Sequence, residues 1–511
     1  MGELPIYCLL STRETTSIVS CLVGKMKVMD LVHLEENMKE LRECFRSRKT
    51  KSATWRRDQL EGLMSLLKEK ESEIFKAVKE DLGKPRAEAY RDEVGVVRKS
   101  LNLALSSLDD WMASKKVYVP RIAFPTNGEI VPEPLGVVLI LSSWNLPFAL
   151  ALDPLIGAIA AGNAAVIKPS ELAPATSSLL AEYIPTYLDN KAVKVFQGGS
   201  PVAERLLEMK WDKIFFTGSP RVGRIVMSAA AKHLTPVALE LGGKCPAVLD
   251  HIPNHRDREV TIRRIVTGKW GACFGQACIA IDYLLVEEKH ASATIDQLKE
   301  WITKFYGDRP LETNSISRIV NKSQFMRLRN LVQDPTVAAS IVHGGHMDED
   351  NLFIEPTILL DPPLESEIMT EEIFGPFLPI ITLKKIEDSI EFVNSKPRAL
   401  AMYVFTKNEN FKKRVIVETS SGSVTFNDAM IQFLCDTLPF GGIGESGFGR
   451  YHGKFSFDTF SHEKAVLRRS FLIELSFGYP PWSDHKLQFL RAAYNFDYIQ
   501  LFLLLLGLKR K

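Results

Sequence analysis

Short apolar runs separated by amphipathic stretches dominate the middle of the chain. Five such runs end in polar or glycine-rich turns, at residues 136–141, 164–170, 193–199, 213–219 and 237–243. Apolar residues recur with helical spacing between the later runs, at roughly 174–185, 201–209 and 221–233. Continuous apolar runs are typical of strands buried on both faces, and their alternation with helices predicts a parallel, doubly wound sheet.

The regions on either side of this core predict helices and a second α/β fold. Residues 30–82 have the apolar spacing of two or three amphipathic helices, and Gly83 followed by Pro85 predicts where they end. From about 244 to 430, helical segments mix with strand-like runs such as "YLLVEE" and "GSVTFND". We therefore expect at least two α/β parts, since 511 residues are too many for one ordinary core.

Composition and charge narrow the class of protein. Hydrophobic residues make up 45% and charged residues 25% of the chain, which is typical of a globular protein and not of a disordered one. The formal net charge is +2, and no basic run is interleaved with aromatic residues. Nothing in the sequence therefore indicates binding to nucleic acid.

The seven cysteines are sparse and include no C-x-x-C pair. We therefore expect neither a disulfide framework nor a metal site. Cys273 and Cys278 lie close together in "GACFGQACIAIDY". These two thiols fit buried packing, a nucleophile beside a buried neighbour, or a pair that links reversibly on oxidation.

The two ends of the chain predict extensions. Residues 1–29 lack the features of a secretory signal or a good transit peptide, and we expect a disordered extension there. At the other end, "YIQLFLLLLGLKRK" holds about ten apolar residues before three basic ones, too few for the roughly 20 residues of a spanning helix. The tail fits a helix packed on protein or an interfacial anchor held by anionic lipid.

Two glycine motifs compete for the role of a phosphate site. Gly442, Gly444 and Gly447 match G-x-G-x-x-G literally, but no helical pattern opens after them and no acidic residue follows a second strand, so we interpret this stretch as a loop. In "FFTGSPRVGR", by contrast, a strand ends, Gly218 and Ser219 form the turn, and Gly223 lies in the first turn of a helix. This second motif predicts an anion site at a helix N-terminus.

Polar side chains at other strand ends and loops complete a candidate constellation. The strand before Lys168 and Glu171 ends in a cation and a carboxylate that suit a ribose. An amide at Asn145, a carboxylate at Glu240 and a thiol at Cys278 follow in order. Together they suit oxidative acyl chemistry, in which a thiolate attacks a carbonyl, an amide stabilises the oxyanion, and a carboxylate activates water.

These stretches resemble the aldehyde dehydrogenase superfamily. The motifs "WN", "KPSE", "FTGS", "LELGGK", "GQAC", "EEIFGP" and "PFGG" occur in the family's order. The segments "GRYHGKFSFDTFSHEKAVLRR" and "YPPW" are similar to the class 3 branch, which includes fatty aldehyde and plant stress-related members. The resemblance covers about residues 30–485 and is specific because many motifs agree in order.

The resemblance implies a role for each motif. It implies that Cys278 is the nucleophile, that Asn145 and the Cys278 N–H form the oxyanion hole, and that Glu240 activates the hydrolytic water. It also implies a cofactor site for NAD, with NADP left open because Lys168 lies beside Glu171. The implied cofactor-binding residues are Lys168 and Glu171 at the adenine ribose, Gly218, Ser219 and Gly223 at the pyrophosphate, and Glu372 and Phe374 at the nicotinamide.

We therefore expect an NAD(P)-dependent dehydrogenase of medium- or long-chain aliphatic aldehydes. The alternatives are a non-catalytic homologue, or a semialdehyde-specific or acylating dehydrogenase. The expected parts are a cofactor domain at 30–241 interrupted near 115–135, a catalytic domain at 242–435, a bridging segment at 436–465, and an extension at 466–511. The resemblance implies a homodimer, and we expect a cytoplasmic protein, with membrane association or an organelle as alternatives.

Overall fold

The computed structural model describes residues 34–506 except 124, 473 and 475, and also residue 508. The expected N-terminal extension and the basic end of the tail lie outside the described residues. The chain divides into two compact units, one comprising Met1–Leu108 and Pro134–Phe460 and the other Asp109–Glu133 and Ser461–Lys511.

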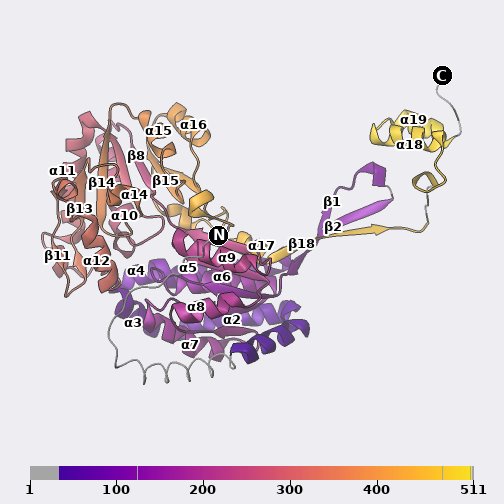
Figure 1. The fold of residues 1–511 in the computed structure, drawn as a ribbon, viewed down its shortest axis with the longest axis horizontal. Helices are drawn as coiled ribbons and strands as arrows, with labels where there is room; N and C mark the ends of the chain where they lie inside the picture. The colour runs from indigo at the N-terminus through magenta and orange to yellow at the C-terminus, as the bar shows by residue number, and fades with distance from the viewer. Residues whose placement is uncertain (1–33, 124, 473, 475, 507, 509–511) are drawn as a thin grey trace, which may run out of the picture. The chain divides into compact units, whose positions relative to one another are not determined.

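The first unit contains the predicted doubly wound sheet (Figure 1). Its six strands follow the order β17-β7-β6-β3-β4-β5, and all neighbours are parallel except β17 and β7. The strands are β3 (Val137–Leu141), β4 (Ala164–Lys168), β5 (Val193–Val195), β6 (Lys213–Gly218), β7 (Val237–Leu241) and β17 (Gly447–Phe448). Five of these strands are the apolar runs of the sequence, and the α/β fold class is confirmed.

Helices between these strands match the predicted ones closely. They are α6 (Ala149–Ala161), α7 (Pro174–Tyr187), α8 (Ser200–Glu208) and α9 (Pro220–Ala231). One core joins the sheet to α8, α9 and the helical residues 34–46, because Leu41, Leu206 and Val226 pack there with the strands. Every residue of α6 is buried, which is why that segment lacks an amphipathic pattern.

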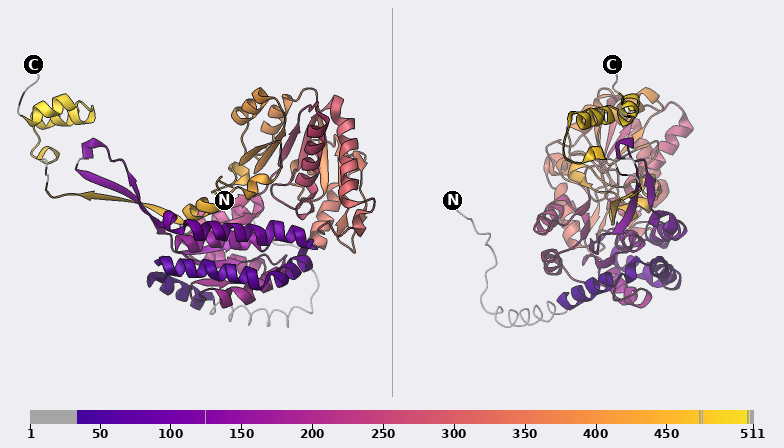
Figure 2. Two further views of the ribbon diagram at one scale, coloured as in Figure 1. Left: turned by 180° about the vertical axis from the view of Figure 1, so that it is seen from behind. Right: turned by 90° about the vertical axis from the view of Figure 1, so that its right-hand side faces the viewer.

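The N-terminal helices α2 (Ala53–Glu69), α3 (Glu71–Leu82) and α5 (Gly95–Met112) pack beside α6 and α7 (Figures 1 and 2). Helix α3 ends at Gly83, whose φ of 66° is the left-handed conformation that favours glycine, so the predicted stop is confirmed. Asp81 of α3 accepts hydrogen bonds from the backbone N–H groups of Ala175 and Thr176 at 2.9 and 2.8 Å. It caps α7, whose own N-cap residue, Ala173, makes no side-chain bond.

A second sheet in the same unit has seven strands, in the order β10-β13-β14-β9-β8-β15-β16. All neighbours are parallel except β10 and β13. The strands are β8 (Pro246–Leu249), β9 (Tyr283–Glu287), β10 (Ile341–His343), β13 (Thr357–Leu360), β14 (Phe377–Leu383), β15 (Ala401–Phe405) and β16 (Ser423–Phe426). The helices of this part are α10 (His255–Trp270), α11 (Glu288–Tyr306), α12 (Lys322–Leu331), α13 (Pro335–Ala338), α14 (Glu367–Thr370), α15 (Asp388–Asn394) and α16 (Glu409–Glu418).

The glycine-rich stretch near the end of the first unit differs from its prediction in one respect. Residues Gly444–Ser446 form a single 3-10 turn, so the motif is the predicted loop and does not link a parallel strand to a helix. However, the short strand β17 and the helix α17 (Gly453–Thr459) follow, although we expected no helix there. Gly447 has a φ of 110°, and a Cβ on it would lie 1.9 Å from the Leu239 carbonyl oxygen, so only glycine fits this pairing.

The second unit is a three-stranded sheet followed by two helices. The strands β1 (Lys115–Val117), β2 (Thr126–Pro134) and β18 (Ser461–Arg469) follow the order β1-β2-β18. The sequence placed the later bridging segment at 436–465, whereas β18 begins at Ser461 and residues before it belong to the first unit. Helices α18 (Asp484–Tyr494) and α19 (Tyr498–Leu505) complete the unit, and α19 contains the apolar tail. Over the described part of the chain, none of the helices has the length and apolar content needed to span a bilayer.

Candidate active site

The predicted site residues lie after strands of the first sheet and in loops of the second. Strand β3 leads to Asn145, and its two neighbours β4 and β6 lead to Lys168 and Gly218. Because these strands are parallel, their carboxyl ends meet at one edge of the sheet. Cys278 lies in the loop between α10 and β9, and Glu372 in the loop before β14.

Cys278 is partly buried, and its thiol is protonated at neutral pH. Burial, followed by the nearby carboxylates of Glu372 and Glu240, raises the pKa of Cys278 to about 12, although backbone N–H groups of the same loop partly oppose the shift. The thiol is therefore electrostatically coupled to two of the predicted site residues, one from each sheet. A thiolate forms here only when a base takes its proton or a cation approaches it.

The two other cysteines near this loop are buried and occupied in hydrogen bonds. Cys245 donates its S–H to the carbonyl oxygen of Cys278 over 3.2 Å. Cys273 donates its S–H to the carbonyl oxygen of Asn145 over 3.1 Å, and burial raises the pKa of both thiols. Of the three, Cys278 alone is accessible, which supports its assignment as the nucleophile.

Glu240 is a buried carboxyl on β7 with no hydrogen-bond partner for either oxygen. Its backbone position is fixed from both sides, because it pairs with Thr217 of β6 and Gly447 of β17. Burial raises the pKa of Glu240 well above its ordinary value. A carboxyl with free oxygens and a raised pKa is suited to take a proton from water near neutral pH.

Asn145 is buried after β3, and its backbone is held by neighbouring elements. The Asn145 carbonyl oxygen accepts a hydrogen bond from Lys84 Nζ at 2.9 Å as well as the one from Cys273. Since the backbone is fixed, the side-chain amide projects from a defined point.

Glu372 lies against the backbone of Gly242 and Gly243. The Gly243 N–H donates to the Glu372 carboxylate, and a Cβ on Gly242 would lie 2.1 Å from Glu372 Oε2. Burial, together with the charge of Asp282, raises the pKa of Glu372 to about 8. The glycine pair of "LELGGK" therefore leaves room for this carboxylate, a role that the sequence alone did not suggest.

Phe374 and Trp144 join the two halves of the site. Their rings meet edge to face with centroids 5.2 Å apart. Phe374 has a φ of 48°, which is rare for a bulky residue and indicates a conformation imposed by its surroundings.

A buried ion pair that sequence reasoning missed anchors the Glu372 loop. Lys244 Nζ pairs with Asp282 and donates to the carbonyl oxygens of Ile368 and Glu371 at 2.8 and 3.0 Å. Asp282 in turn accepts the Ile373 N–H at 3.0 Å. The signal available in the sequence was a lysine and an aspartate among apolar residues, where charges are almost always paired.

The expected cofactor residues at the ends of β4 and β6 have local features that fit a dinucleotide. Ser219 is the exposed N-cap of α9 and accepts from Val222 N–H at 3.4 Å, so this twelve-residue helix presents its positive end beside β6. Lys168 Nζ and Glu171 Oε2 are 2.5 Å apart at the end of β4. Their carboxylate and ammonium groups suit ribose hydroxyls, and the helix end suits a pyrophosphate.

The glycines among these residues are required by packing within the protein. A Cβ on Gly218 would lie 2.5 Å from the Phe216 ring, and one on Gly223 would lie 2.9 Å from Leu241 Cδ2. Gly223 therefore lets α9 approach the sheet. This packing alone explains a glycine at position 223, whether or not the residue also faces the cofactor. Across the described residues, no cluster of histidine, cysteine and carboxylate side chains has the arrangement of a metal site.

Comparisons with known proteins agree with this geometry. The model of the aldehyde dehydrogenase family matches residues 18–466. The chain is 55% identical over 477 residues to aldehyde dehydrogenase family 3 member F1 of Arabidopsis thaliana, covering 93% of this chain and 99% of that protein. It is 43% identical over 455 residues to family 3 member A2 of Mus musculus, covering 89% and 92%.

Among solved structures, the substrate-bound state of Staphylococcus aureus AldH matches with a TM-score of 0.87 and 40% identity, covering 90% of this chain and 99% of that one. The family match spans most of the chain, and both relatives bear the family 3 name. The chain therefore belongs to the class 3 branch of the aldehyde dehydrogenase family and oxidises aldehydes with NAD(P) as its cofactor.

Proposed function

We propose that the chain oxidises medium- to long-chain aliphatic aldehydes to carboxylic acids through a covalent intermediate on Cys278. The observation that carries this proposal is the coupling of one accessible thiol to a buried, unpartnered carboxyl on the neighbouring sheet. The chain-length preference rests on the class 3 resemblance of the segments around 450–482.

The first steps form a carbon–sulfur bond. A carboxylate accepts the thiol proton, and both Glu372 and Glu240 are close enough to be coupled to that thiol. The Cys278 sulfur then attacks the carbonyl carbon, and the carbonyl π electrons move to the oxygen. The Asn145 amide and the Cys278 N–H stabilise that oxyanion, an interaction of the kind worth a hundred- to a thousandfold in turnover per donor.

When bound, NAD(P) would supply the hydride acceptor for this oxidation, which leaves the acyl group on Cys278 as a thioester. Lys168, Glu171, Ser219 and the start of α9 hold its adenosine and pyrophosphate part, beside Gly218 and Gly223. Glu372 and Phe374 position the nicotinamide end. Glu171 disfavours a 2′-phosphate by like-charge repulsion, which favours NAD over NADP.

Glu240 completes turnover by hydrolysis. It takes a proton from water, the resulting hydroxide attacks the thioester carbonyl, and the carbon–sulfur bond breaks with Cys278 leaving as the thiolate. A base placed to activate water favours hydrolysis over transfer of the acyl group to coenzyme A. The intact trio of Cys278, Glu240 and Asn145 also disfavours a non-catalytic homologue.

The test is initial NADH or NADPH formation from aldehydes of two to sixteen carbons, with wild type and Cys278→Ala. Turnover that rises with chain length and disappears in the variant supports the proposal. Turnover confined to semialdehydes, or dependent on added coenzyme A, identifies one of the two related enzymes. Cofactor binding without any turnover identifies a non-catalytic homologue.

We also propose that the chain forms a homodimer through its second unit. Phe471 and Leu472 are almost fully exposed after β18, and Trp482 is mostly exposed before α18. Exposed large apolar side chains of this kind occur on surfaces that a partner covers. Light scattering coupled to size-exclusion chromatography should give a dimer for wild type and a monomer for Phe471→Ser/Leu472→Ser. A double variant that stays dimeric contradicts this interface.

The apolar tail is proposed to give weak membrane association. Ile499 and Phe502 of α19 are exposed, as is Leu508 beyond it. Full-length protein should co-sediment with phosphatidylcholine vesicles containing phosphatidylserine, and Phe502→Ser should sediment less. Equal sedimentation of the two proteins, or none of either, contradicts the proposal.

A further inference from the structure

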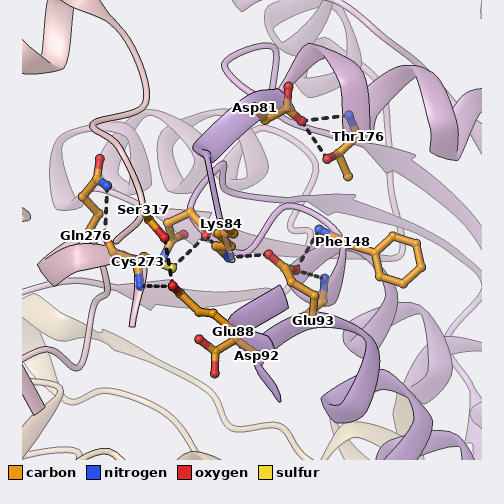
Figure 3. A network of polar contacts seen from close by, with 12 residues as sticks. Asp81, Lys84, Glu88, Asp92, Glu93, Phe148, Thr176, Cys273, Gln276 and Ser317 are labelled. Atoms are coloured by element: carbon orange, nitrogen blue, oxygen red, sulfur yellow. Dashed lines mark hydrogen bonds and ion pairs between the residues drawn. The ribbon is translucent and has the colours of Figure 1, made fainter. Parts of the chain in front are cut away.

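A fully buried ion pair lies beside the Asn145 loop, outside the residues that the proposed mechanism uses. Lys84 follows α3, and Glu93 lies in a π-helical turn at Tyr90–Val94 that precedes α5. Their side chains are 0% exposed, and Lys84 Nζ lies 2.6 Å from Glu93 Oε1 (Figure 3). Removing two charges from water is expensive, so such a pair is weak evidence for stability, and a role in fixing one geometry is a hypothesis to examine.

Both members of the pair use their remaining hydrogen-bonding capacity on one loop. Lys84 Nζ donates to the Asn145 carbonyl oxygen at 2.9 Å. Glu93 Oε2 accepts from the Phe148 and Ala149 N–H groups at 3.2 and 2.9 Å. The N-cap residue of α6, Phe148, makes no side-chain cap bond, so Glu93 caps this helix from another element. The pair therefore forms hydrogen bonds with the backbone at both ends of the segment 145–149.

The same carbonyl oxygen is bonded to the loop that carries the nucleophile. Cys273 Sγ donates to Asn145 O at 3.1 Å. The Cys273 N–H donates to Glu88 Oε1 at 2.7 Å (Figure 3). Cys273 has a φ of 48°, so its backbone is held in the left-handed region, and Gln276 Nε2 donates to its carbonyl oxygen at 2.9 Å. Glu88 also accepts from Ser317 Oγ at 3.0 Å, which ties the segment to the second sheet's part of the unit.

We propose that Lys84 is a positioning residue that fixes Asn145 against the Cys273–Cys278 loop, with Glu93 and Cys273 as its partners. The inference rests on the oxyanion role of Asn145 in the proposed function. The carbonyl oxygen of Asn145 accepts one hydrogen bond from the Lys84 ammonium and another from the Cys273 thiol in the nucleophile loop. If this backbone shifts, the Asn145 side-chain amide moves away from the position that the substrate oxyanion takes beside the Cys278 sulfur.

The expected signature is a loss of turnover without a loss of binding. An oxyanion interaction exists only after the carbonyl has been attacked, so misplacing its donor lowers kcat and leaves substrate affinity little changed. Lys84→Met should lower kcat by about 10- to 1000-fold, up to the effect of losing the donor itself. Its affinity for NADH, measured by fluorescence titration, should stay within about twofold of wild type, since Lys84 touches none of the expected cofactor residues.

A double-mutant cycle separates positioning from a general structural effect. Lys84→Met, Asn145→Ala and the double variant are assayed together, with Lys194→Met as a control that removes a partly buried ion pair with Glu40 elsewhere. If Lys84 acts through Asn145, Lys84→Met should cost less than about threefold in the Asn145→Ala background. An equal cost in both backgrounds overturns the proposal, as does an equal loss in Lys194→Met.

Two further results complete the test. The single variant Asn145→Ala tests the oxyanion role in the proposed function separately. If it turns over as fast as wild type, that role is overturned. If Lys84→Met does not fold, Cys273→Ala and Cys273→Ser decide, since both leave the buried charge pair intact. Cys273→Ala should lower kcat and Cys273→Ser, whose hydroxyl can donate to Asn145 O, should restore most of it. Equal kcat values in these two variants and wild type overturn the proposal.

Discussion

Replacing Glu240 by glutamine tests the assignment of the hydrolytic base. Glutamine has nearly the same shape, and neither Glu240 oxygen has a hydrogen-bond partner to lose, so the change removes the base with little disturbance of packing. General-base catalysis contributes about 10²- to 10⁴-fold, so the hydrolytic barrier should rise by about 3–5 kcal/mol. The acylation step should survive, because the Glu240 charge raises the Cys278 pKa and Glu372 remains to accept the thiol proton.

The assay is stopped-flow NADH fluorescence with intact-mass spectrometry. Glu240→Gln should give a burst close to one NADH per site, then a slow steady state with acyl-enzyme mass. Cys278→Ala is the control and should give no burst. A wild-type steady-state rate in Glu240→Gln, or slow turnover without an acyl adduct, would refute the assignment.

The same variant makes a stability prediction of definite sign. The pKa of Glu240 is raised on folding, so the folded state holds its proton to higher pH than the unfolded state does. The unfolded state therefore releases more protons, and stability falls as pH rises above the ordinary glutamate range. Glu240→Gln removes this loss, so its Tm should exceed that of wild type at pH 8–9 and approach it near pH 4. A lower Tm at alkaline pH contradicts the burial of an unpartnered carboxylate.

Three further predictions follow from the site. The pKa of Cys278 near 12 predicts that its alkylation by iodoacetamide without cofactor rises about tenfold per pH unit from pH 7 to 10, and a plateau below pH 9 contradicts it. Gly242→Ala should weaken NADH binding, measured by fluorescence titration, because the new Cβ would lie 2.1 Å from Glu372 Oε2 and displace that carboxylate. An unchanged affinity would show that Glu372 does not contribute to cofactor binding. Glu171→Gln should raise the ratio of kcat/KM for NADP over NAD, and an unchanged ratio places the 2′-phosphate elsewhere.

The sequence predicted the parts of the fold that depend on local pattern. The apolar runs before Asn145, Lys168 and Gly218 are strands, because burial on both faces requires continuous apolar residues whatever their partners are. Motif order also located Cys278, whose accessibility among buried thiols agrees with its assignment.

The interactions that hold the site together could not be predicted in this way. Lys84 meets Asn145 across 61 positions of sequence, and Lys244 meets Glu371 across 127. The periodicity of the sequence does not predict such pairings, because each lysine ammonium donates a hydrogen bond to a backbone carbonyl oxygen in a distant loop. The pairing of Gly447 with Glu240 is likewise absent from any local pattern, because the two residues come from distant parts of the sequence.

The pairing of β17 with β7 also affects the order in which the protein can be completed during synthesis. The strand partner of Glu240 is Gly447, more than two hundred residues later in the chain. Until that residue leaves the ribosome, β7 is an open sheet edge, and such edges invite pairing with other chains. A nascent chain that ends before Gly447 therefore carries the proposed nucleophile and the proposed hydrolytic base but lacks the strand that closes the sheet beside that base.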